Sequence, residues 1–161
     1  MDYIITNRTQ AISVMKSSYY RTKVYEVHDI KYSRSSPLTI IKQNCKMYGT
    51  DYAVWNRLVQ RILKRNSKLP IPISPETGIF FVPTSSHRNE YCTWINYYKV
   101  AEYVEHNDKL HIILQDGQVI VSPVSINQFK LQMKRTSVII AHFFQLFLYQ
   151  TQIEKDKSPN P

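Results

Sequence analysis

Most apolar segments of this chain are short, β-prone runs that follow one another with few residues between them. A parallel neighbour requires a crossover connection of about a dozen residues or more, so links this short favour antiparallel pairing. The strongest hairpin signal is Asp116-Gly117, which separates the alternating run 110–114 from the apolar run 119–121. Asp and Gly readily adopt the positive φ of a type I′ turn. The chain is therefore expected to be built mainly around antiparallel sheet.

Further strands are predicted from β-branched and aromatic runs bounded by polar breaks. They cover residues 3–6, 12–15, 23–27, 38–41, 79–82 and 91–98.

Two segments instead have helical spacing. In residues 51–68 the apolar side chains recur three and four positions apart, with Thr50 or Asp51 available as N-cap and Pro70 as a stop. A second helix is predicted from a cap at Ser125 to about Tyr149. The fold class is therefore predicted to be α+β, with a basic amphipathic helix (51–68) and a long C-terminal helix (125–149).

The chain length fits one domain, predicted for residues 1–153, followed by a polar segment (154–161) predicted to be disordered. Only three glycines are present, far apart, which excludes a glycine-rich phosphate cradle. The start shows no secretory signal, and the longest apolar stretch (138–149) is shorter than the roughly 20 residues of a membrane span. We expect a cytoplasmic protein without a membrane partner.

The two cysteines, Cys45 and Cys92, form no Cys-x-x-Cys pair, and no histidine lies beside them at ligand spacing. No metal and no cofactor are therefore predicted, and both thiols are interpreted as buried. Ser85-Ser86-His87 and Cys92 could be a nucleophile and base, but no nucleophile elbow or recognisable Cys/His signature surrounds them. The chain is not expected to be an enzyme.

The formal net charge is +9, and residues 31–68 hold nine basic residues against one acid, Asp51. A surface of one sign indicates nucleic acid or an anionic membrane as partner, whereas the simpler alternative is a solvated helix face. Along the predicted helix the cations lie opposite the apolar side chains. Tyrosines beside basic residues could stack on unpaired bases, although most of these rings lie in β-type runs.

The C-terminal helix carries more apolar residues than one face requires, so it is either a central core helix or half of an oligomer interface. The candidates for oligomerisation are Phe143, Phe144, Leu146, Phe147 and Leu148.

The segments Asn44-Cys45-Lys46-Met47-Tyr48-Gly49, 79–86 and 92–95 resemble the family of the competence transcription factor ComK of Gram-positive bacteria. This resemblance implies a bacterial, nucleoid-associated activator of genes for DNA uptake and recombination. It implies binding to AT-rich double-stranded DNA through the minor groove, as a dimer or tetramer. It also implies capture by an adaptor of a Clp protease, for which Phe147, Leu148 and Tyr149 resemble the family's C-terminal segment.

No helix offers Asn, Gln and Arg side chains together for reading base edges, so readout of phosphates and groove shape is the simplest mechanism. Two alternatives remain open: an RNA- or ribosome-associated basic module, and a protein that pairs with related activators without productive promoter binding. The predicted DNA contacts are Arg57, Arg61, Lys64, Arg65 and Lys68, supported by Arg34, Lys42 and Lys46.

Overall fold

The structure is a computed structural model that describes residues 2–157. In this part of the chain, strands and helices follow one another with two short 3-10 helices, η1 and η2. Their order is β1 (Thr9–Val14), β2 (Thr22–Glu26), β3 (Asp29–Ser33), α1 (Pro37–Met47), α2 (Tyr52–Leu63), β4 (Ile71–Ser74), η1 (Pro75–Thr77), β5 (Ile79–Pro83), β6 (Thr93–Asn96), η2 (Tyr97–Lys99), β7 (Val100–His106), β8 (Lys109–Leu114), β9 (Val119–Ser122) and α3 (Ile126–Lys157).

The strands form a six-stranded sheet in the order β3-β2-β1-β6-β5-β4 and a three-stranded sheet in the order β7-β8-β9. Every pairing between neighbouring strands in these two sheets is antiparallel. The predicted α+β class with mainly antiparallel sheet is therefore confirmed.

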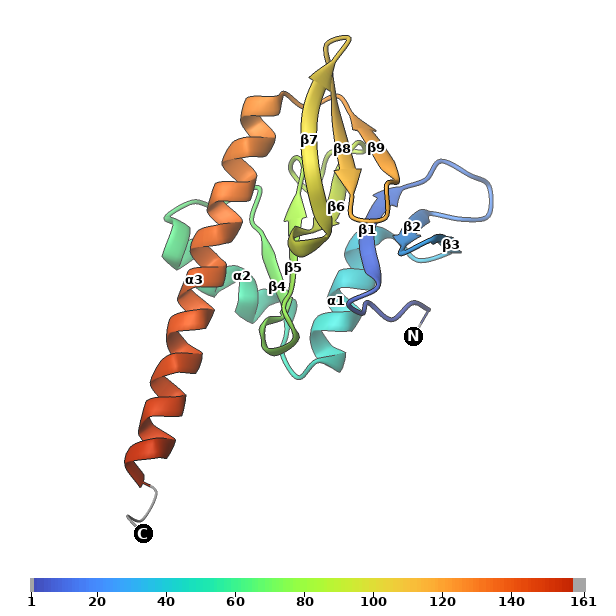
Figure 1. The fold of residues 1–161 in the computed structure, drawn as a ribbon. Helices are drawn as coiled ribbons and strands as arrows, with labels where there is room; N and C mark the ends of the chain where they lie inside the picture. The colour runs from blue at the N-terminus through green and yellow to red at the C-terminus, as the bar shows by residue number, and fades with distance from the viewer. Residues whose placement is uncertain (1, 158–161) are drawn as a thin grey trace.

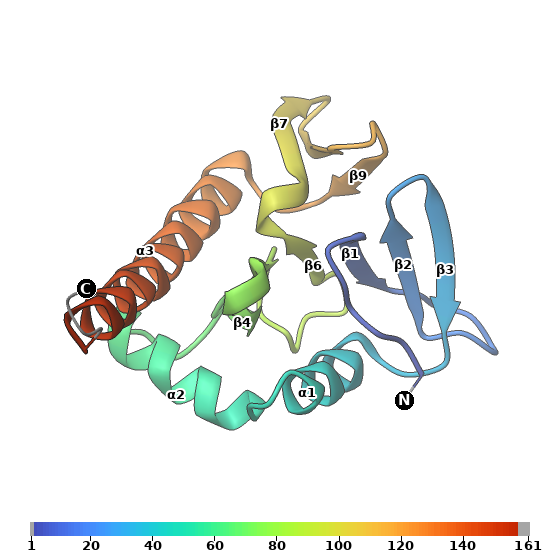
Figure 2. The ribbon, with the colours of Figure 1, turned by 60° about the horizontal axis from the view of Figure 1, so that its bottom comes forward.

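Helix α1 and the small sheet lie on different sides of the large sheet. Figures 1 and 2 show α1 on one side of the six-stranded sheet and β7–β9 on the other, with α2 following α1. Helix α3 contacts α2, β5 and β7, and its C-terminal half extends beyond the sheets (Figure 1).

Three groups of buried side chains hold these layers together. One joins α1 to the six-stranded sheet and includes Ile41 and Phe81. Another joins the two sheets and includes Phe129 of α3. The last joins α2 to α3 and includes Val59 and Phe143. Each buried apolar side chain of this size contributes about 1.5–3 kcal/mol, so the buried residues from Phe129 to Phe143 hold α3 against the sheets and against α2.

The predicted hairpin is present as β8 and β9, but its turn differs from the expected one. Leu114 faces Gln118 across the turn, and the Leu114 amide donates to the Gln118 carbonyl at 2.8 Å. Three residues therefore form the loop, and Gly117 alone of them has a positive φ, of 90°. A three-residue hairpin loop commonly uses a type I turn followed by such a glycine.

The strand predicted at 38–41 is wrong, because these residues belong to α1. Ser36 caps this helix, its Oγ accepting from the Thr39 amide at 3.2 Å, and Pro37 occupies the first turn. Pro at this position is already in the helical φ range and needs no donor. Ile40, Ile41 and the later Cys45 then share the buried face.

The strand predicted at 3–6 is also absent, since a side chain takes the hydrogen bonds that a neighbouring strand would supply. The Asn44 Oδ1 accepts from the Ile5 amide at 2.8 Å, and its Nδ2 donates to the Tyr3 carbonyl at 2.9 Å. Three strands, β3, β4 and β7, lie outside the predicted runs, and only residues 93–96 of the predicted run 91–98 form a strand.

Both predicted helices have different C-terminal ends. Helix α2 ends at Leu63 rather than at Lys68, because Lys64 adopts the left-handed conformation with a φ of 55°. Helix α3 continues past Tyr149 to Lys157, so residues 154–157 of the tail predicted to be disordered are helical. Lysines in its last turn stabilise the negative end of the helix dipole. Residues 158–161 of that tail lie outside the described residues.

Candidate nucleic-acid interface

Helix α2 separates its apolar and basic side chains as predicted. Asp51 caps it, its Oδ1 accepting from the Ala53 amide at 2.8 Å. Val59 is fully buried against α3, while Arg57 and Arg61 are exposed. The two guanidinium groups, four positions apart, therefore lie on one exposed stripe of the helix.

The other three predicted cations of this segment lie in the loop after α2. Lys64 and Lys68 both have positive φ, and the Arg65 Nε donates to the Ser67 carbonyl at 3.0 Å. The loop is held by the buried Gln132 of α3, whose Nε2 donates to the carbonyls of Lys68 at 2.9 Å and Pro83 at 2.8 Å. The prediction of one continuous basic helix face is thus wrong at its C-terminal end.

Arg135 of α3 joins this loop, although no local pattern in the sequence relates the two. Its Nη1 donates to the Gln132 Oε1 at 2.8 Å. Partial burial, and then the charge of the neighbouring Arg65, lower the pKa of Arg135. A cation from α3 therefore adds to the positive potential of residues 64–68.

Helix α1 contributes its lysines beside the start of α2. The Lys42 Nζ lies 5.5 Å from the centre of the Tyr52 ring, and Lys42 and Lys46 line one pocket with Asp51 and Tyr52. The predicted lysines of α1 thus lie next to α2. We call the cations of α1, α2, the following loop and α3 the basic surface; it consists of Lys42, Lys46, Arg57, Arg61, Lys64, Arg65, Lys68 and Arg135.

Arg34 is the one predicted contact that the structure places apart from α2. Its guanidinium carbon lies 4.2 Å from the centre of the Tyr19 ring, and its backbone amide donates to Asp2 at 3.2 Å. It follows β3, at the edge of the six-stranded sheet far from α3 (Figure 2).

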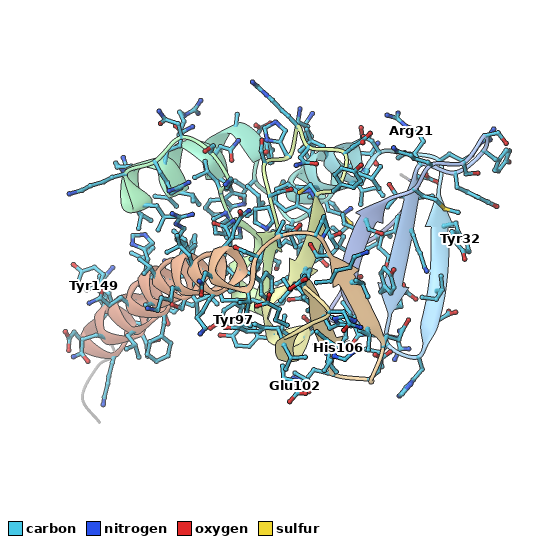
Figure 3. The ribbon with its side chains drawn as sticks, turned by 90° about the horizontal axis from the view of Figure 1, so that it is seen from above. Arg21, Tyr32, Tyr97, Glu102, His106 and Tyr149 are labelled. Atoms are coloured by element: carbon cyan, nitrogen blue, oxygen red, sulfur yellow. The ribbon has the colours of Figure 1, made fainter. Side chains whose placement is uncertain are left out.

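The loop between β5 and β6 lies between these two basic regions. His87 of this loop lines one pocket with Asn56 and Lys68 and another with Arg21 and Arg88. Partial burial, then the charges of Arg88 and Lys42, lower the pKa of His87. The positive potential therefore continues across this loop toward Arg21, which Figure 3 shows along the same edge of the molecule as α2.

The opposite side of the molecule is acidic. The strands β7–β9 and their turns, residues 100–122, contain four acids and one lysine. Glu102, Glu105 and Asp108 are exposed there, and Figure 3 shows Glu102 at the edge opposite Arg21. We call this sheet the acidic sheet.

Comparison with known proteins identifies the family of the chain. The model of the ComK protein family matches residues 1–146. The chain belongs to the ComK family. It is 28% identical over 123 residues to the competence transcription factor of Bacillus subtilis (strain 168), an alignment that covers 76% of this chain and 64% of that protein. No solved structure matches.

The ComK family match covers every residue of the basic surface, and it ends at Leu146. Phe147, Leu148 and Tyr149, which resemble the family's adaptor-binding segment, therefore lie just beyond it.

In this ComK family member the second half of α3 has two different sides. Phe143 is buried in the protein's own core, and Phe147 packs against the same cluster. Phe144 is 62% exposed, Leu148 54% and Tyr149 66%. Leu146 is also exposed. The five residues predicted for oligomerisation thus divide between the core and a free apolar surface.

The cysteines of this ComK family member are free and buried. Burial, with a smaller contribution from Asp51, raises the pKa of the Cys45 thiol to about 12. Burial also raises the pKa of Cys92, whose Sγ donates to the Ser85 carbonyl at 3.4 Å. A raised pKa disfavours the reactive thiolate.

Within residues 2–157 no cluster of three or more His, Cys, Asp or Glu residues could hold a metal ion. None of the helices described there is long and apolar enough to span a bilayer.

Proposed function

We propose that this protein is a transcriptional regulator of competence genes that binds double-stranded, AT-rich DNA through the minor groove as a homo-oligomer. The observation that carries the proposal is the basic surface, which combines cations from three helices and a loop in a member of the ComK family. In cells it would be cytoplasmic and associated with the nucleoid.

The basic surface is suited to phosphates rather than to base edges. Arg57 and Arg61 are exposed on α2, and none of the acids of the described chain forms an ion pair with them. Arginine side chains without ion-pair partners can bind phosphates and release condensed counterions from DNA. This release gives affinity with little sequence preference.

Sequence preference would then come from DNA shape. A run of A·T pairs narrows the minor groove and strengthens its negative potential, which favours inserted arginine. A helix with side chains is about 10–12 Å wide and the minor groove only about 6 Å, so α2 would follow the phosphates instead of entering the groove.

The exposed side of α3 supplies the proposed oligomer interface. Phe144 and Leu148 are one helical turn apart and project beyond the sheets with α3, so two copies of α3 could pack against each other there. Leu146 and Tyr149 are exposed on other sides of the same helix, and the segment 147–149 would be the contact for an adaptor of a Clp protease.

The oligomer is tested with Phe144→Glu/Leu148→Glu. A charge at each position opposes burial between two helices, so sedimentation should give the monomer mass while the circular dichroism spectrum stays unchanged. An unchanged assembly mass would contradict this interface.

The DNA proposal is tested by fluorescence anisotropy at physiological salt. The probes are a labelled duplex with spaced A and T runs, a GC-rich duplex of equal length and a single-stranded RNA, with a minor-groove drug as competitor. Preference for the AT-rich duplex that the drug abolishes would support the proposal. Equal binding to all three probes, or preference for RNA, would favour the RNA-associated module instead.

A further inference from the structure

Two loops outside the basic surface meet beside α1. The loop between β1 and β2 is closed by the Met15 amide donating to the Arg21 carbonyl at 2.9 Å. The loop between β5 and β6 begins with the Thr84 amide donating to the Thr93 carbonyl at 2.9 Å. An ion pair joins the two loops, with 3.0 Å between the Lys16 Nζ and the Glu90 Oε2.

Each loop contributes an arginine to the same open pocket of about 270 Å³. Arg21 comes from the first loop and Arg88 from the second, and both are exposed. Within the described chain, neither guanidinium forms an ion pair with a carboxylate. Two unpaired guanidinium groups around one concave site are a typical arrangement for binding a phosphate.

The remaining polar groups of the pocket are compatible with an anion. Glu90 is the one carboxylate among the lining residues, and Lys16 neutralises it. His87 and Asn89 add potential donors beside Arg88. The Ser36 hydroxyl also lines the pocket but already caps α1, so the arginines would provide the main contacts.

The position of the pocket connects it to the basic surface. His87 lines this pocket and also the pocket that contains Lys68 and Asn56 of the α2 region. Arg21 and α2 lie along the same edge of the molecule in Figure 3. A polyanion that follows α2 would therefore pass this pocket.

We propose that Arg21 and Arg88 jointly bind one backbone phosphate of the DNA, at a second contact beyond the basic surface. This inference rests on the proposed function and adds a site to it. The two loops would fix the position of the protein along the duplex, since two guanidinium groups that bind one phosphate define its position. The single exposed arginines of α2 impose no such geometry.

The inference is tested by anisotropy with Arg21→Ala, Arg88→Ala and the double variant, on the AT-rich duplex over a range of salt concentrations. Each single variant should bind on the order of 10-fold more weakly. The double variant should lose less than the product of the two single losses, because both arginines bind the same phosphate. Lys109→Ala removes one charge from the acidic sheet and should bind like wild type.

Methylphosphonate scanning identifies the phosphate. Neutralising one particular phosphate should weaken wild-type binding by about the factor lost in Arg21→Ala, and the double variant should be insensitive to it. Inorganic phosphate alone, followed by the His87 ring signals, tells a general anion pocket from one that needs DNA. Saturation at low millimolar phosphate without any methylphosphonate effect would overturn the DNA assignment.

The outcomes separate this inference from the proposed function. If wild type binds the AT-rich duplex and both arginine variants bind equally well, the phosphate site is wrong and the proposed function stands. If Arg57→Ala/Arg61→Ala also leaves binding unchanged, the basic surface is wrong as well. If wild type does not bind duplex DNA at all, both are overturned.

Discussion

The basic surface and the acidic sheet occupy opposite sides of one small domain and differ in how their charges are arranged. The cations come from α1, α2, a loop and α3, whereas the acids lie on and between three consecutive strands. A uniform excess of positive charge would favour solubility only. Charges separated onto two sides also orient the molecule, because a polyanion attracts the basic side and repels the acidic side. Under the proposed function, the basic surface would approach DNA and the acidic sheet would face away.

The largest expected effect concerns the attachment of the acidic sheet to the rest of the protein. Phe129 is fully buried, with its ring centre 4.9 Å from that of Tyr103 of β7. Phe129→Ala should lower the free energy of unfolding by about 3–5 kcal/mol, because it leaves a cavity between the sheets. Chemical denaturation measures it, and amide exchange should accelerate in β7–β9.

Phe144→Ala is the matched control on the same helix. Its ring is largely exposed, so the loss in the monomer should stay within about 0.5 kcal/mol. Equal losses for the two variants would mean that α3 does not hold the acidic sheet as described.

Charge reversal compares the two sides directly. Arg57→Glu/Arg61→Glu should weaken binding to the AT-rich duplex on the order of 100-fold, and the slope of log K against log salt should fall by about 2. Glu102→Lys/Glu105→Lys adds positive charge to the acidic sheet. Salt screens charges more than about 8 Å apart, so the affinity for the duplex should change by less than roughly 3-fold. A larger effect from the glutamate pair, measured by anisotropy, would reverse the proposed orientation.

A smaller effect is expected where the acidic sheet meets the β2–β3 turn. The Asp116 Oδ2 accepts from the His28 amide at 2.8 Å and from the Gln118 Nε2 at 2.6 Å. Burial acts to raise the pKa of Asp116, but hydrogen bonds from Gln10, the His28 amide and Gln118 outweigh it and hold the pKa well below its usual range.

A lowered pKa stabilises the fold above the unfolded value of about 3.9, and this contribution is lost as the pH falls below it. Asp116→Asn should therefore cost about 1 kcal/mol at neutral pH and progressively less as the pH falls below about 4. Denaturation at several pH values checks this. If the difference in unfolding free energy between wild type and Asp116→Asn stays constant with pH, the carboxylate charge has no role.

The smallest expected effect is a change in the pKa of His87. Partial burial and the charges of Arg88 and Lys42 lower it in the free protein. A DNA phosphate beside His87 would favour the protonated ring, so its pKa should rise by roughly half a unit in the complex. Affinity should then increase up to about 3-fold as the pH falls through the His87 pKa. NMR of the ring Cε1–H signal measures this, and a lower pKa in the complex would place the phosphate elsewhere.

The arrangement of the basic surface and the acidic sheet was only partly predictable from the sequence. Helix α2, its Asp51 cap and the β8–β9 hairpin follow from local patterns, since spacing, capping and turn residues determine them within a few positions. Helix α1 was misread because Ile40 and Ile41 are β-branched, although Ser36 and Pro37 are a local signal for a helix start.

The functional surface depends more on tertiary contacts. The loop after α2 is held by Gln132, which is 64 residues from Lys68 in sequence, and Arg135 reaches Arg65 from α3. Arg21 and Arg88 share a pocket only because β1 and β6 are neighbours in the sheet. No periodicity in the sequence relates residues that tertiary contacts bring together. The charge-rich segment 31–68 therefore predicts only the part of the basic surface that precedes α3.

Amide chemical-shift mapping of the ¹⁵N-labelled protein, titrated with the AT-rich duplex, shows which side of the molecule binds DNA. We expect perturbations on α1, α2, residues 64–68 and the loops that carry Arg21 and Arg88, with the exposed residues of β7–β9 unchanged. Perturbations that are largest on β7–β9, with α1 and α2 silent, would contradict this expectation.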